Sequence, residues 1–68
     1  MRNAHFKTET YTTKSGVARV RIMPLKGNNV LDVPLRELSL YIDQMRKDYA
    51  EAGKNVVFHG KYGEEVAV

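Results

Sequence analysis

The chain has 68 residues and the composition of a small globular domain. Hydrophobic residues make up 43% of it and charged residues 28%, values typical of a folded rather than a disordered chain. Cysteine is absent, which excludes disulfides and cysteine-based zinc sites and favours a reducing, cytoplasmic location. The formal net charge is +3, and residues 1–30 hold six basic residues against one acidic residue, so the positive charge is concentrated there.

No segment of the sequence predicts membrane insertion or export. The first five residues lack the apolar stretch of a secretory signal peptide, and no apolar run approaches the roughly 18 residues of a membrane span. A core this small supplies only about 3–5 kcal/mol of net stability, which small domains often supplement by self-association. We therefore expect a homodimer.

The first part of the chain predicts a β-hairpin. Residues 5–13 are rich in β-branched and aromatic types, and residues 18–22 alternate apolar and basic side chains, as half-buried strands do. Between them, Lys14, Ser15 and Gly16 form a turn whose glycine suits the left-handed position of a three-residue hairpin loop. With Thr13 opposite Val17, Tyr11 faces Arg19 and Glu9 faces Arg21.

This register divides the hairpin into two faces. One carries threonines and the apolar residues Ala18, Val20 and Ile22, and is expected to lie under a helix. The other face, together with the two turns, presents the candidate nucleic-acid-binding residues, which are Lys7, Tyr11, Lys14, Arg19, Arg21 and Lys26.

The middle of the chain predicts a turn, a short strand and one helix. Residues 26–29 form the turn and residues 30–33 the strand, and Pro34 allows a helix to begin only at Pro34 or after it. Gly53 supplies the C-terminal stop. The apolar residues recur at spacings of three and four along one helical stripe, made up of Leu35, Leu38, Ile42, Met45, Tyr49 and Ala52.

The last part of the chain predicts one more strand over residues 55–59, a turn over 60–63, and a final strand or pairing tail over 64–68. The fold class is therefore α+β: a small antiparallel sheet of order β-β-β-α-β, with a possible further strand, and one amphipathic helix on one face. This arrangement resembles the sheet-plus-helix dimers of the PUR and Whirly types, which bind single-stranded nucleic acid. The resemblance is one of architecture, without a shared motif.

Two kinds of partner fit these features. A basic ribbon with an aromatic side chain can follow a phosphate backbone and stack a base, which predicts DNA or RNA binding in a regulatory role. The alternative is a protein-interaction module of the kind phages and plasmids encode, an inhibitor or accessory factor that docks on an acidic host protein. It would use Leu40 and Tyr41, which lie off the main helical stripe, or an exposed strand edge. A third interpretation is a solvated strand face in which Glu9 neutralises Arg21.

The sequence predicts no enzyme, no metal site and no cofactor. The only serines are Ser15, in a turn, and Ser39, on the helix, and neither lies in a nucleophile motif. His5 and His59 belong to no local metal-binding pattern. Residues 60–63 match the Gly-x-x-Gly string of RNA-binding KH domains, but that loop needs a helix on each side, and a hairpin turn is favoured here.

Overall fold

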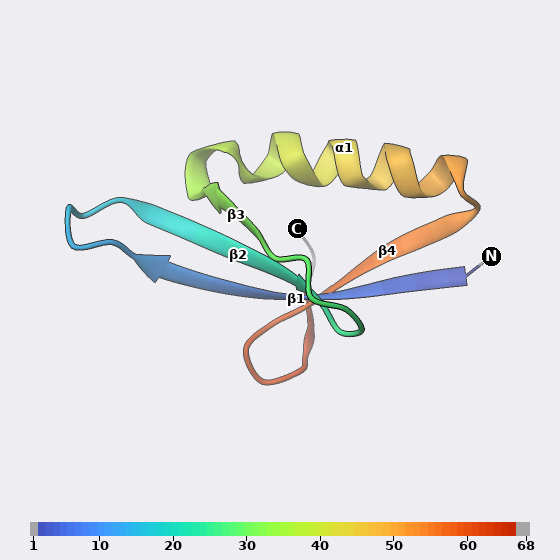
Figure 1. The fold of residues 1–68 in the computed structure, drawn as a ribbon, viewed down its shortest axis with the longest axis horizontal. Coiled ribbons are helices and arrows are strands. Elements are labelled where there is room, and N and C mark those ends of the chain that lie inside the picture. Colours follow the sequence, from blue (N-terminus) through green and yellow to red (C-terminus); the bar gives the residue numbers. More distant parts are fainter. Residues whose placement is uncertain (1, 67–68) are drawn as a thin grey trace.

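The computed structural model describes residues 2–66 and shows one five-stranded sheet with a helix across one face (Figure 1). The order of elements confirms the predicted α+β fold, and the optional last strand is present. The elements are, in chain order, β1 (Arg2–Thr12), β2 (Ala18–Pro24), β3 (Leu31–Pro34), the 3-10 turn η1 (Leu35–Glu37), α1 (Leu38–Glu51), β4 (Lys54–His59) and β5 (Glu65–Val66).

The strand order is β3-β2-β1-β4-β5, and the sheet is mixed rather than wholly antiparallel. All neighbouring pairs are antiparallel except β1 and β4, which run in the same direction. This difference from the predicted sheet follows from the connection. The helix α1 leads from β3 at one edge, over β2 and β1, to β4, and a helical crossover of this kind joins strands that run in parallel.

The β1–β2 hairpin has the register that the sequence predicts. Tyr11 pairs with Arg19 and Glu9 with Arg21, and the amide of Thr13 donates to the carbonyl of Val17 at 2.9 Å. Gly16 closes the turn with a φ of +86°, a conformation that a residue with a Cβ rarely adopts. The local turn chemistry therefore determines which side chains share a face.

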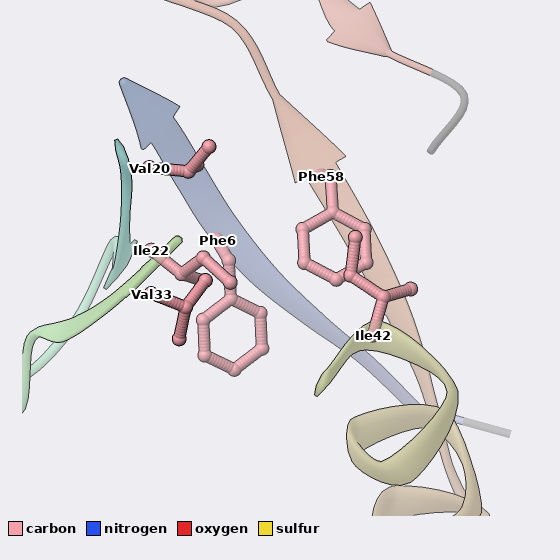
Figure 2. Packing of buried hydrophobic residues seen from close by; sticks show 6 residues of the cluster. All are labelled: Phe6, Val20, Ile22, Val33, Ile42 and Phe58. Carbon is pink, nitrogen blue, oxygen red and sulfur yellow. The ribbon is translucent and has the colours of Figure 1, made fainter. Parts of the chain in front are cut away.

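Six side chains form the core between the sheet and the helix (Figure 2). They come from four strands and the middle of α1, and they are Phe6, Val20, Ile22, Val33, Ile42 and Phe58. Phe58 is 1% exposed and its ring centre lies 6.1 Å from that of Phe6. Val20, Ile22 and Ile42 are core positions that the alternation and the helical stripe predict. The strands β1, β3 and β4 add Phe6, Val33 and Phe58, which the sequence patterns did not mark.

The helix is shorter and less completely buried than its apolar stripe suggests. Pro34 ends β3 in an extended conformation, with ψ of 139°, and the 3-10 turn begins at Leu35. Ile42 is buried, but Leu35 at one end of the stripe is 43% exposed and Ala52 at the other is exposed. Gly53 ends the segment at a φ of +74°, as predicted.

The hairpin projects beyond the helix on the left of Figure 1. Eleven residues of β1 span about 36 Å at roughly 3.3 Å per residue, whereas the 14 residues of α1 span about 21 Å. Thr10 and Thr12 therefore stay exposed although they point to the helix side of the sheet, contrary to the expected cover. We call this projecting part, residues 10–19, the hairpin arm.

Residues 60–63 form the turn of a second hairpin, which joins β4 to β5. The amide of Gly60 donates to the carbonyl of Glu64 at 2.7 Å, and strand pairing follows at once on both sides. This confirms the predicted turn, and no helix flanks it on either side within the described chain, so the KH-like string is not a KH loop. The predicted final strand extends to residue 68, and its last two positions lie outside the described residues.

Within residues 2–66, no helix is both long and apolar enough to cross a membrane.

Candidate functional site

The sheet has one face that α1 does not cover, and we call it the open face. The strand registers place six charged residues, two histidines and one tyrosine on it, namely His5, Lys7, Glu9, Tyr11, Arg19, Arg21, Asp32, His59 and Glu65. Four of the six predicted nucleic-acid-binding residues are among them. The other two, Lys14 in the hairpin turn and Lys26 in the β2–β3 loop, are exposed near the ends of β2.

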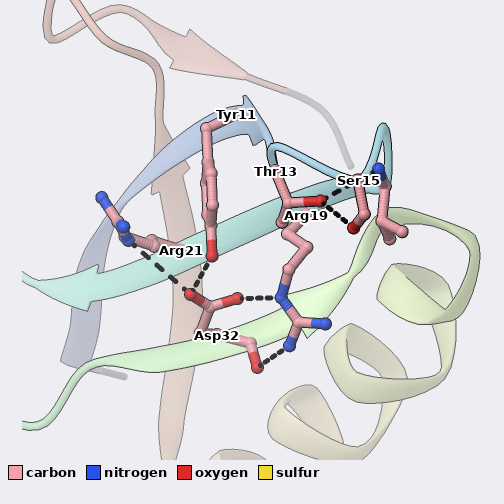
Figure 3. A network of polar contacts seen from close by, with 7 residues as sticks. Tyr11, Thr13, Ser15, Arg19, Arg21 and Asp32 are labelled. Carbon is pink, nitrogen blue, oxygen red and sulfur yellow. Dashed lines mark hydrogen bonds and ion pairs between the residues drawn. The ribbon is translucent and has the colours of Figure 1, made fainter.

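Three of these predicted residues meet at a carboxylate that the sequence analysis did not single out (Figure 3). Arg19 donates from Nε to Oδ1 of Asp32 at 2.8 Å, and from a terminal nitrogen to the carbonyl of Asp32 at 3.2 Å. The hydroxyl of Tyr11 donates to Oδ2 of the same carboxylate. Arg21 approaches Oδ2 from the other side, with Nε at 3.6 Å.

Tyr11 and Arg21 also stack on each other. The guanidinium carbon of Arg21 lies 4.2 Å from the centre of the Tyr11 ring, a typical cation–π distance. One face of the ring is thus covered by protein, and only the other face is available to a base. The aromatic side chain is held in place by its hydroxyl at one end and by this stack.

The predicted pairing of Glu9 with Arg21 is not the ion pair that forms. Glu9 lies opposite Arg21 in the register, but its carboxylate contacts Lys7, with Nζ 3.8 Å from Oε1. The arginines form their ion pairs with Asp32 instead. This is possible because β3 pairs with β2 in a register that places Asp32 opposite Arg21. The only sequence signal was a single aspartate inside the short apolar run of residues 30–33.

These contacts change the electrostatics of the open face. The hydrogen bond from Tyr11, followed by that from Arg19, holds the pKa of the Asp32 carboxyl below the ordinary aspartate range. The hydrogen bond to Asp32 likewise raises the pKa of Arg19, which stays charged throughout the physiological range. The three cations of the open face are thus matched in number by its three carboxylates, those of Glu9, Asp32 and Glu65. Lys14 and Lys26, near the ends of β2, add positive charge beside this face.

The stability difference between the parent and a variant without the Asp32 charge should depend on pH in a defined way. Because the pKa of Asp32 is lowered by folding, its stabilising contribution is complete above the unfolded pKa and is lost as pH falls through the folded one. We expect Asp32→Asn to be less stable than the parent at pH 7, and the difference to shrink below about pH 4. Urea midpoints measured from pH 7 to pH 2.5 give this comparison.

The matched control is Asp43→Asn, which removes a carboxylate from the exposed side of α1. It should leave the urea midpoint nearly unchanged at every pH. If the two variants follow the same pH profile, the Asp32 network does not stabilise the fold.

The two histidines, which the sequence places far apart, lie side by side on the open face. Their neighbouring strands β1 and β4 bring Nδ1 of His5 to 2.9 Å from Nε2 of His59, and the ring centres to 5.1 Å. Nδ1 of His59 also lies 3.2 Å from the carbonyl of Gly63. In the part of the chain that is described, no group of three or more His, Cys, Asp or Glu side chains is placed to hold a metal.

The predicted protein-interface residues lie on α1. Leu40 is 67% exposed and Tyr41 is 41% exposed. Val17 and Leu35 form a second exposed apolar region, where the base of the hairpin turn meets η1, and they line a shallow hollow with Pro34. These two apolar regions are separate from the open face.

No protein-family model, no curated protein and no solved structure matches this chain. The architectural resemblance to PUR and Whirly proteins therefore gains no support from known sequences or structures. The function of the chain has to be inferred from its own residues, above all from the contacts on the open face and the exposed side of α1.

Proposed function

We propose that this protein is a non-enzymatic, cytoplasmic binding protein that takes single-stranded DNA or RNA on its open face. The observation that carries the proposal is the register of the first hairpin, which gathers Tyr11, Arg19 and Arg21 on the one sheet face that α1 leaves uncovered. An aromatic side chain among cations is the usual combination for binding single strands, because the ring stacks a base and the cations follow the phosphates.

The Asp32 network is compatible with phosphate binding. A guanidinium has five N–H donors, and Arg19 uses those of Nε and one terminal nitrogen within the protein. The remaining donors are held in a fixed orientation, so less conformational entropy is lost when a phosphate binds. Asp32 also lowers the net charge, which favours moderate and reversible affinity over tight, non-selective binding.

Single strands fit this site better than duplexes. One face of the Tyr11 ring is covered by Arg21, and the other face can stack only on a base that is not already stacked in a helix. On a duplex, the hairpin arm would contact phosphates and the base edges in a groove, and Tyr11 would add little to the affinity.

The experiment is fluorescence anisotropy with a labelled single-stranded DNA, its duplex and the matching RNA, each titrated at several salt concentrations. We expect micromolar or tighter binding of a single strand at low salt. Each phosphate neutralised should add about −0.7 to the slope of log K against log salt. Absence of binding to all three probes at low salt would overturn the proposal, and preference for the duplex would replace the stacking mode by groove binding.

A second candidate function is docking on a protein, and the exposure of Leu40 and Tyr41 favours it. In this case the partner is an acidic host protein, as for a phage- or plasmid-type accessory factor, or a second copy of the chain. For the homodimer we expect sedimentation to show a concentration-dependent dimer that Leu40→Lys converts to a monomer. Ala50→Lys, which adds the same charge at an exposed helix position away from the face of Leu40 and Tyr41, should leave the dimer intact. A monomer at every concentration in the parent protein would exclude this dimer.

A further inference from the structure

Nδ1 of His5 and Nε2 of His59 are as far apart as two nitrogen ligands at right angles on one metal ion. When two nitrogens bind one ion at about 2.05 Å each and their bonds to the ion meet at a right angle, the nitrogens lie about 2.9 Å apart. That is the separation of His5 Nδ1 and His59 Nε2. In a tetrahedral site the same bonds would place them about 3.3 Å apart.

The surroundings of His59 prepare one of these nitrogens for coordination. If Nδ1 of His59 donates its proton to the carbonyl of Gly63, the lone pair remains on Nε2, which is the atom that faces His5. Metal-binding histidines usually have such a partner on the second ring nitrogen, and it fixes both the tautomer and the ring orientation. The β4–β5 turn thus supplies the outer contact of a metal ligand.

We propose that His5 and His59 form a two-imidazole site for Cu²⁺ or Ni²⁺. Both ions bind imidazole nitrogen strongly and favour ligands at right angles, and their remaining positions can be filled by water. In the present structure the rings contact each other through a nitrogen–nitrogen hydrogen bond. In this hydrogen bond His5 donates from Nδ1 to the lone pair on Nε2 of His59. On binding, the proton of His5 moves from Nδ1 to Nε2 by exchange with solvent, and each ring turns about its Cβ–Cγ bond so that the two lone pairs converge on the ion.

The charges near the pair permit a cation. Lys7 stands opposite His59 in the register, but its ammonium is drawn towards Glu9, 3.8 Å away. Glu65 stands opposite His59 on the other side and places a carboxylate on the same face. The site is independent of the proposed nucleic-acid binding, because it uses neither Tyr11 nor the arginines.

The test is a titration of the purified protein with Cu²⁺, followed by calorimetry and by electron paramagnetic resonance. We expect one ion per chain, coupling to two imidazole nitrogens, and weaker binding near pH 5 than near pH 7.5, since protons compete for the ligands. His5→Gln and His59→Gln should each weaken binding at least about tenfold, since even outer partners of metal-binding histidines are worth about 10- to 100-fold in affinity. Asn55→Gln, an exposed neighbour on β4, should bind like the parent.

One outcome would exclude the site even if a variant were to fold poorly. His59→Gln leaves the N-terminal segment unchanged, so unaltered affinity in this variant would mean that the ion binds elsewhere. In the parent protein, line broadening by Cu²⁺ in an amide NMR spectrum should centre on residues 5, 57 and 59. Broadening centred on any other segment would overturn the proposal.

Discussion

Phe58→Ala is expected to leave the chain largely unfolded at room temperature. The side chain is 1% exposed in the middle of the core, where it packs beside Phe6 and under Ile42 of the helix (Figure 2). Truncating a buried phenylalanine to alanine costs about 3–5 kcal/mol, because apolar contacts are lost and a cavity remains. A domain of this size has about the same amount of net stability, so nothing would be left to hold the fold.

Far-ultraviolet circular dichroism with urea and thermal titrations measures this effect. Phe58→Leu keeps most of the volume and should retain a cooperative transition at a lower midpoint. Val17→Ala, at a position that is 46% exposed, should melt close to the parent. A cooperative Phe58→Ala transition within a few degrees of the parent would mean that the core between α1 and the sheet is not the main source of stability.

The double variant Arg19→Gln, Arg21→Gln is expected to lose most single-strand binding. Both guanidiniums lie beside Tyr11, and each lost phosphate contact should weaken binding roughly tenfold at low salt. The slope of log K against log salt should become shallower by about 1.4, since each neutralised phosphate on a single strand contributes about 0.7. Anisotropy with the probe that binds the parent most tightly gives both quantities.

The matched control is Arg36→Gln, Lys47→Gln, which removes the same charge from exposed positions in η1 and α1. It should change affinity little and leave the salt slope nearly intact, because these residues do not lie on the open face. If the control loses as much affinity as the test variant, binding depends on net charge rather than on the Tyr11–arginine cluster. Circular dichroism of both double variants tests whether they remain folded, since the arginine variant leaves Asp32 without its ion-pair partners.

Local rules in the sequence determined the elements and the faces of the hairpin. Gly16 and the alternation of residues 18–22 set the register, so the positions of Tyr11, Arg19 and Arg21 on one face could be predicted. Pro34 and Gly53 marked the ends of the helical segment in the same way. These signals act over a few residues, where backbone sterics and hydrogen bonds decide the conformation.

Only the tertiary structure decided which charges and rings meet. Asp32 reaches the arginines because β3 pairs with β2, and His5 reaches His59, 54 residues away, because β1 and β4 pair in parallel. Strand order depends on the path by which the helix crosses the sheet. The path that forms is the one that buries the most apolar area over the whole chain. A pattern that spans a few residues does not specify the strand order. The aspartate in the run of residues 30–33 was therefore visible in the sequence, but its arginine partners and the histidine pair could not be predicted.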